Sequence, residues 1–220
     1  ATNAIIYSSN LLTTFIFYEI LTISTYPLVT FKGDDDSISS GKKYLYYLLG
    51  TSIIFLLPAI IIIYSIAGTL DYKIGGILTS YNNPLMINIL IILLIFGVAK
   101  SAIMPFHKWL PFAMIAPTPV SALLHAVAVV KSGVFIIIKV VLYIFGPLIL
   151  QESGASIILI LFASITILLS SITAIKQDNI KLRLAYSTIG QLSYIVLAIS
   201  ILAPYSILAA TLHLIFHATG

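Results

Sequence analysis

Several ionisable side chains stand inside long apolar stretches of this sequence. Glu19 lies halfway along the first apolar run, and Lys100 and Lys131 lie deep within later ones. A charge at the centre of a lipid bilayer costs about 2.5–3.5 kcal/mol on insertion scales, so such residues are usually functional. Burial opposes the charged form of a lysine, and a nearby carboxylate supports it. A lysine with a movable acidic partner can therefore take up and release protons, and these residues predict a proton relay.

The relay is predicted to continue along one helix. At 100° per residue, His125 and Lys139 fall about 40° apart, and Lys131 lies about 80° from Lys139, so all three reach one seam. Three alternatives stay open. Lys139 can extend to the headgroups from a helix end, and His125 can be a hydrogen-bonded core histidine. Lys131 and Glu19 can form a structural ion pair, although buried pairs are poor stabilisers.

A pair of histidines occurs near the end of the sequence. His213 and His217 are four residues apart, which is the spacing of a metal-binding pair on a helix. A zinc protease needs glutamate after the first histidine, and this chain has Leu214 there. The pair therefore predicts a place on the proton path or simple packing, and we expect no metal site. Ser101 and Ser187 have no histidine at an obvious helical spacing, so we expect no catalytic residues.

The composition indicates that these residues belong to an integral membrane protein. Of 220 residues, 60% are hydrophobic and 8% are charged, and cysteine is absent. A soluble domain carries about 25% charged residues. The composition thus excludes an ordinary soluble enzyme, a disordered chain, a disulfide scaffold and a thiol-ligated metal cluster. The net charge of +4 is a weak argument for nucleic-acid binding, and we expect none, because the cations gather at one side of the predicted bilayer or inside it.

The apolar runs are long enough for membrane helices of about 20 residues. We expect a single all-α transmembrane domain, a polytopic helical bundle, with spans at about 5–31, 44–66, 85–116, 119–145, 156–175, 183–203 and 204–220. The third run is too long for one straight helix and contains Pro105 and Pro111. It predicts one crossing made of two half-helices with a break near 102–106, the alternative being a re-entrant loop.

Lysine and arginine predict the orientation of these spans. The first, third and fifth loops hold Lys32, Lys42, Lys43, Lys176, Lys181 and Arg183, with Lys108 added if it lies near a helix end. The other loops hold only Lys73. This bias places the 32–43 loop in the cytoplasm and residue 1 outside. Because the sequence begins without methionine and stops within an apolar segment, we expect an internal piece of a longer protein.

Two blocks of sequence resemble a known family. The segment Lys100-Ser-Ala-Ile-Met-Pro-Phe-His-Lys-Trp-Leu-Pro, continued by Ala116-Pro-Thr-Pro-Val-Ser-Ala-Leu-Leu-His125, is similar to the antiporter-like subunits shared by Mrp-type cation/proton antiporters and respiratory complex I. Leu184-Ala-Tyr-Ser-Thr-Ile-Gly-Gln-Leu-Ser-Tyr and the His213-to-His217 ending fit the same family. The resemblance covers nearly the whole chain.

The resemblance implies particular roles and a particular fold. Glu19 matches the family's essential acid, which pairs with the lysine at Lys100 on a discontinuous helix, and His125 matches a histidine on the proton route. Lys181 stands in a loop motif as an interfacial charge. Full-length members have about fourteen helices in two inverted repeats, and this chain resembles the first repeat and the start of the second. The lysine that usually follows the His-x-x-x-His pair is beyond the sequence.

The expected function is a proton-translocating subunit of a multisubunit monovalent cation/proton antiporter, because Lys131 is more typical of the Mrp-type members. The alternatives are a proton-pumping membrane-arm subunit of NADH:quinone oxidoreductase and a structural subunit without transport. The expected partners are other membrane subunits, the bilayer, protons and Na⁺ as a second ion. We expect no cofactor, translocase activity only within a complex, and a bacterial inner membrane rather than a mitochondrial one.

Overall fold

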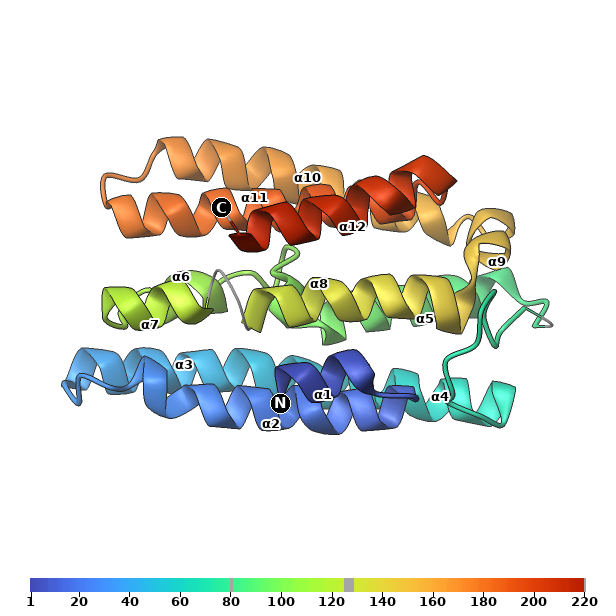
Figure 1. Ribbon diagram of the computed structural model, residues 1–220, viewed down its shortest axis with the longest axis horizontal. Coiled ribbons are helices and arrows are strands. Elements are labelled where there is room, and N and C mark those ends of the chain that lie inside the picture. Colours follow the sequence, from blue (N-terminus) through green and yellow to red (C-terminus); the bar gives the residue numbers. More distant parts are fainter. Residues whose placement is uncertain (80, 125–128, 220) are drawn as a thin grey trace.

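The computed structural model describes residues 1–79, 81–124 and 129–219, with side chains up to residue 217. Its helices run along one common direction and form three layers (Figure 1). The first layer holds α1–α4, the middle layer α5–α8, and the third layer α10–α12. The expected all-α membrane bundle with a discontinuous helix is confirmed.

The first layer contains a short helix and two long ones. They are α1 (Thr2–Tyr7), α2 (Leu11–Val29) and a continuous helix made of α3 (Asp35–Thr51), a π-helical turn (Ser52–Leu56) and α4 (Leu57–Ala67). The structure differs from the expected single span at 5–31. The chain turns at Ser8-Ser9-Asn10, and α1 lies beside α2, with residue 1 midway along the bundle rather than at its end (Figure 1). Asn10 caps α2, because its Oδ1 accepts a hydrogen bond from Thr13 N–H at 2.7 Å.

The middle layer contains the interrupted helix. Its elements are α5 (Pro84–Gly97), a 3₁₀ turn η2 (Ala99–Ser101), α6 (Trp109–Ala113), α7 (Thr118–Ala122), α8 (Val129–Val140) and a π-helical turn (Val141–Phe145). The short helix α9 (Pro147–Glu152) then leads to the third layer (Figure 1). The break lies earlier and is wider than the sequence indicates, because α5 ends at Gly97 and α6 begins only at Trp109. Within η2, Lys100 is completely buried.

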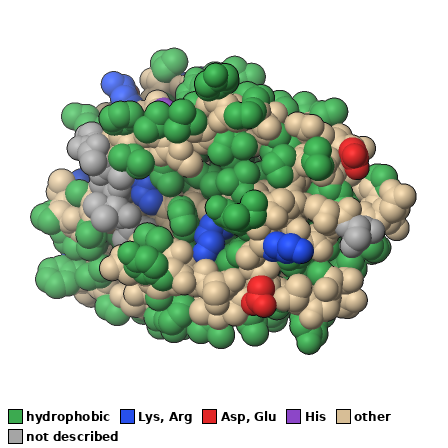
Figure 2. Space-filling model, turned by 45° about the vertical axis from the view of Figure 1, so that its right-hand side comes forward, with side chains coloured by type: hydrophobic (Ala, Val, Ile, Leu, Met, Phe, Trp, Pro, Cys, Tyr) green, Lys and Arg blue, Asp and Glu red, His purple; other side chains and the backbone are tan. Residues whose placement is uncertain are grey.

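The third layer consists of α10 (Ala155–Ile175), α11 (Ile180–Ser200) and α12 (Pro204–Thr219). The helix ranges Leu11–Val29, Asp35–Ala67, Ala155–Ile175 and Ile180–Ser200 are long and apolar enough to cross a membrane. Figure 2 shows a face covered mainly by hydrophobic side chains, with isolated charged ones among them. Such a surface suits lipid rather than water.

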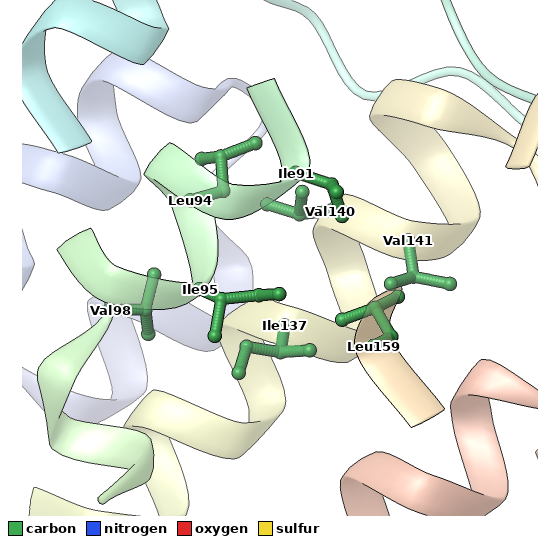
Figure 3. A pocket seen from close by; sticks show the side chains of 8 residues that line it. All are labelled: Ile91, Leu94, Ile95, Val98, Ile137, Val140, Val141 and Leu159. Atoms are coloured by element: carbon green, nitrogen blue, oxygen red, sulfur yellow. The ribbon is translucent and has the colours of Figure 1, made fainter. Parts of the chain in front are cut away.

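Between the layers the core is apolar and tightly packed. A void of only about 10 Å³ separates α5, α8 and α10. Figure 3 shows that hydrocarbon side chains line it, namely Ile91, Leu94, Ile95, Val98, Ile137, Val140, Val141 and Leu159. A void of this size and lining is too small and too apolar to hold a chain of water molecules.

Candidate functional site

The break in the middle layer leaves backbone groups without helical partners, and side chains satisfy them. Tyr18 Oη accepts a hydrogen bond from Lys100 N–H at 3.2 Å and donates to Gly97 O at 3.5 Å. Trp109 Nε1–H donates to Ala99 O at 2.7 Å. Met104 N–H donates to Thr166 Oγ1 at 3.1 Å. An interrupted helix is stable at membrane depth only when the protein itself supplies such partners.

The ammonium group of Lys100 is held by the first layer. Its Nζ donates to Tyr18 O at 2.7 Å and to Thr22 Oγ1 at 2.6 Å, and it lies 3.0 Å from the centre of the Tyr18 ring. Tyr18, Thr22 and Lys100 are each completely buried. The partners of this buried cation are thus a carbonyl, a hydroxyl and an aromatic face.

Glu19 lies within electrostatic reach of Lys100, but it does not bond to it. Both carboxylate oxygens are buried, and neither has a hydrogen-bond partner in the described part of the chain. Ser52 of the π-helical turn lies nearby, and its hydroxyl donates to Leu49 O at 3.0 Å. Leaving a buried carboxylate unbonded is costly. The structure therefore places the acid and the lysine that the sequence predicts as a pair close together, with the lysine bonded elsewhere.

Close contact with α8 fixes the position of Lys100. Gly133 lies against the 3₁₀ turn, and a Cβ atom there would be 2.4 Å from both Lys100 C and Ser101 N. Only glycine allows the two backbones to approach so closely. In the same way, a Cβ atom on Gly97 would be 2.4 Å from Leu56 N in the π-helical turn.

Lys131 lies on α8 and reaches the third layer. Its Nζ forms a hydrogen bond with His217 Nδ1 of α12. The rings of His217 and His213 have their centres 6.3 Å apart. The buried Nε2 atom of His213 has no hydrogen-bond partner among the residues described. The structure thus joins Lys131 to the histidine pair.

Lys139 lies eight residues further along α8 and points to a different element. It is 8% exposed. Its Nζ donates to Ser8 O at 2.8 Å, to Ser8 Oγ at 3.2 Å and to Ile6 O at 3.4 Å. A cation at the last carbonyls of α1 is favourable because these carbonyls form the negative end of the helix dipole. The Lys139 ammonium thus has its hydrogen-bond partners within the protein, at the end of α1 and at Ser8.

The sequence-based hypothesis did not include several residues that contact these groups. Tyr18 and Thr22 are four residues apart on α2, on the side that faces the break, and their spacing was the only available signal. Ser8 and Gly133 looked like ordinary loop and helix residues. His125, which the sequence also indicates, lies outside the described residues.

The whole sequence matches a family of membrane proteins. The family model described as "NADH:quinone oxidoreductase/Mrp antiporter, TM" matches residues 8–219. The A/B subunit of a probable K⁺/H⁺ antiporter from Rhizobium meliloti is 34% identical over 219 residues, which is 98% of this chain and 21% of that protein. The L subunit of NADH-quinone oxidoreductase from Buchnera aphidicola is 35% identical, over 97% of this chain and 34% of that protein.

Solved structures agree with the sequence matches. A chain of the Mrp complex from Dietzia superposes with a TM-score of 0.84 and 29% identity, covering 98% of this chain and 23% of that chain. A chain of the archaeal membrane-bound sulfane sulfur reductase superposes with a TM-score of 0.81 and 28% identity, covering 99% and 44%. This chain therefore spans a fifth to less than half of the proteins it matches. It is an integral membrane protein and belongs to the family of NADH:quinone oxidoreductase/Mrp antiporter transmembrane subunits.

Proposed function

We propose that this chain is the proton-translocating part of a membrane subunit in a multisubunit monovalent cation/proton antiporter. Protons move through Glu19, Lys100, His125, Lys131 and Lys139, and His213 and His217 line the same path. The similarity to part of a probable K⁺/H⁺ antiporter over nearly the whole chain supports this assignment.

One observation carries the proposal. Lys100 is completely buried on an interrupted helix, and its ammonium is bonded to Thr22 and to Tyr18 O rather than to the Glu19 carboxylate nearby. A static structural ion pair would place the ammonium on the carboxylate. Separated partners within reach of each other fit a pair that forms and breaks, and a lysine changes its proton affinity when its acid moves.

The further members of the relay are supported by their contacts. The Lys131–His217 hydrogen bond links the middle layer to the third layer. Histidine exchanges protons near neutral pH without large perturbation, so it is suited to the step beside a lysine. Lys139 then stands toward the end of the bundle that holds the 68–83 loop.

The surroundings of the chain are also proposed from its relatives. We place it beside other membrane subunits of a large complex in a bacterial inner membrane, with Na⁺ or another monovalent cation as the second ion. The second candidate is a proton-pumping subunit of NADH:quinone oxidoreductase, which the match to the Buchnera protein favours. Subunits that purify with the full-length protein distinguish the two, since one assembly contains redox subunits and the other does not.

Replacement of Lys100 tests the proposal. In the full-length protein within its complex, Lys100→Ala removes the exchangeable proton, and proton flux in reconstituted vesicles should fall by at least about tenfold. The matched control is Lys42→Ala, which removes an exposed lysine at a bundle end. It should leave the flux unchanged.

The amount of assembled complex must be measured beside the flux, because Lys100 also fills buried space. Normal assembly with lost flux supports the relay. Normal assembly with normal flux would mean that the subunit is structural.

A further inference from the structure

A chain of hydroxyl groups leads away from Lys139. Its Nζ lies 3.2 Å from Ser8 Oγ, which lies 2.6 Å from Thr14 Oγ1, which lies 2.8 Å from Tyr72 Oη. The residues come from α8, the turn between α1 and α2, the first turns of α2, and the 68–83 loop. Three parts of the chain that are distant in sequence, residues 8–14, the loop with Tyr72 and α8, thus supply one continuous row of hydrogen-bonding groups.

Each hydroxyl in the row can face in two directions. In the Ser8–Thr14 and Thr14–Tyr72 pairs, either oxygen can be the donor. Ser8 Oγ also has Ile5 O as an acceptor at 2.7 Å, and Thr14 Oγ1 has Asn10 O at 2.9 Å. These carbonyls stabilise the rotated orientations, so the hydroxyls can turn without losing every hydrogen bond.

The two ends of the row differ in their environment. Ser8 and Thr14 are 9% and 1% exposed, and Lys139 is buried beside them. Tyr72 is half-buried, and its neighbours Asp71 and Lys73 are exposed. The Tyr72 ring lies 4.1 Å from Lys139 Nζ and packs against Tyr143. The row therefore leads from a buried lysine to a half-buried tyrosine of a loop whose neighbouring residues are exposed.

We propose that Ser8, Thr14 and Tyr72 form a proton wire between Lys139 and the end of the bundle that holds the 68–83 loop. This inference rests on the proposed function. Lys139 gives a proton to Ser8, Ser8 gives its own proton to Thr14, Thr14 gives its own to Tyr72, and Tyr72 releases one to water. Each hydroxyl gains one proton and loses one, so all three end neutral. Their hydrogen bonds then point in the opposite direction along the row. One proton crosses, and the lysine is left neutral until it is reloaded.

A cavity adjoins the inner end of the wire. It has a volume of about 110 Å³ and is lined by residues of α1, α8 and α12, including Lys131, Ser132 and Ile6. Ile6 also supplies a carbonyl to Lys139 Nζ. Since a water molecule takes about 30 Å³ of liquid volume, the cavity has room for a few water molecules beside Lys131. In this proposal Lys131, which lines the cavity, is the source from which Lys139 is reloaded.

Removal of the middle hydroxyl tests the wire. Thr14→Val keeps the shape of the side chain and interrupts the row, and proton flux of the full-length protein in its complex should fall about tenfold, the factor given by one lost hydrogen bond of ordinary strength. Thr14→Ser should restore the flux, and the solvent deuterium isotope effect should differ between Thr14→Val and the unchanged protein. The matched control is Thr13→Val, one residue away and outside the row, which should have no effect.

Several outcomes would overturn the wire. One is unchanged flux in Thr14→Val, and another is equal loss in Thr14→Val and Thr14→Ser, which would assign Thr14 to packing. If Thr14→Val does not assemble, Tyr72→Phe asks the same question and keeps the ring that packs on Tyr143. Loss of flux in Lys100→Ala with normal flux in these variants would reject the wire alone, whereas normal flux in Lys100→Ala would reject the proposed function.

Discussion

At the scale of single residues, Tyr18 organises the surroundings of Lys100. Its hydroxyl joins Lys100 N–H to Gly97 O across the break, and its ring and carbonyl contact the ammonium. Tyr18 thus contacts both the backbone of the interrupted segment and the ammonium of Lys100, whose proton is proposed to move. Thr22, one turn further along α2, completes this site.

Tyr18→Phe should destabilise the interrupted segment between α5 and α6 while leaving the aromatic ring in place. The Lys100 N–H then stays buried without a partner, which costs about 1–3 kcal/mol of stability. We expect a lower thermal unfolding temperature of the purified complex and reduced proton flux. Tyr46→Phe serves as the control, because Tyr46 is 82% exposed. Equal stability of the two variants would show that the hydrogen bonds of the Tyr18 hydroxyl do not stabilise the interrupted segment.

The sequence was sufficient to single out ionisable residues within apolar helices, but it could not identify their partners. Glu19 and Lys100 are conspicuous because ionisable side chains are costly among isoleucine and leucine. The acceptors of Lys100 are a backbone carbonyl and a threonine hydroxyl, and both are common in any helix. Such contacts follow from how α2 faces the break, which depends on tertiary packing.

At the scale of elements, the interruptions of the helices position the polar groups. The pair of prolines predicts that the third span is broken, yet α5 already ends at Gly97. The early end follows from packing, since Gly97 lies against the π-helical turn at Leu56 and the 3₁₀ turn lies against Gly133. The sequence-based prediction did not include the turn at 8–10. This turn places the end of α1 next to Lys139, whose Nζ donates to Ser8 O.

Gly133→Ala should displace the 3₁₀ turn. The new methyl group would overlap Lys100 C and Ser101 N, and overpacking of this kind costs about 1–3 kcal/mol. We expect lower stability and a clear loss of proton flux. The control is Gly50→Ala in α3, where an added Cβ meets nothing within 4 Å, and where alanine favours the helix. Normal flux in Gly133→Ala would mean that the position of Lys100 is not critical.

At the scale of the whole molecule, the surroundings of α8 include an apolar void and a row of polar contacts. On the side that faces α5 and α10, the eight residues that line the void are all apolar (Figure 3). Elsewhere Lys100, Lys131 and Lys139 reach α2, α12 and the α1–α2 turn in turn. A row of polar contacts beside a dry core is what a proton path through a membrane requires, because water must not leak beside it.

The most direct test of the central claim is the proton flux of Glu19→Gln in the full-length protein within its complex. Glutamine keeps the size of the side chain and removes the charge that reloads Lys100. The account predicts a fully assembled complex whose flux has fallen by at least about tenfold. An assembled complex that carries protons as fast as the unchanged protein would contradict it.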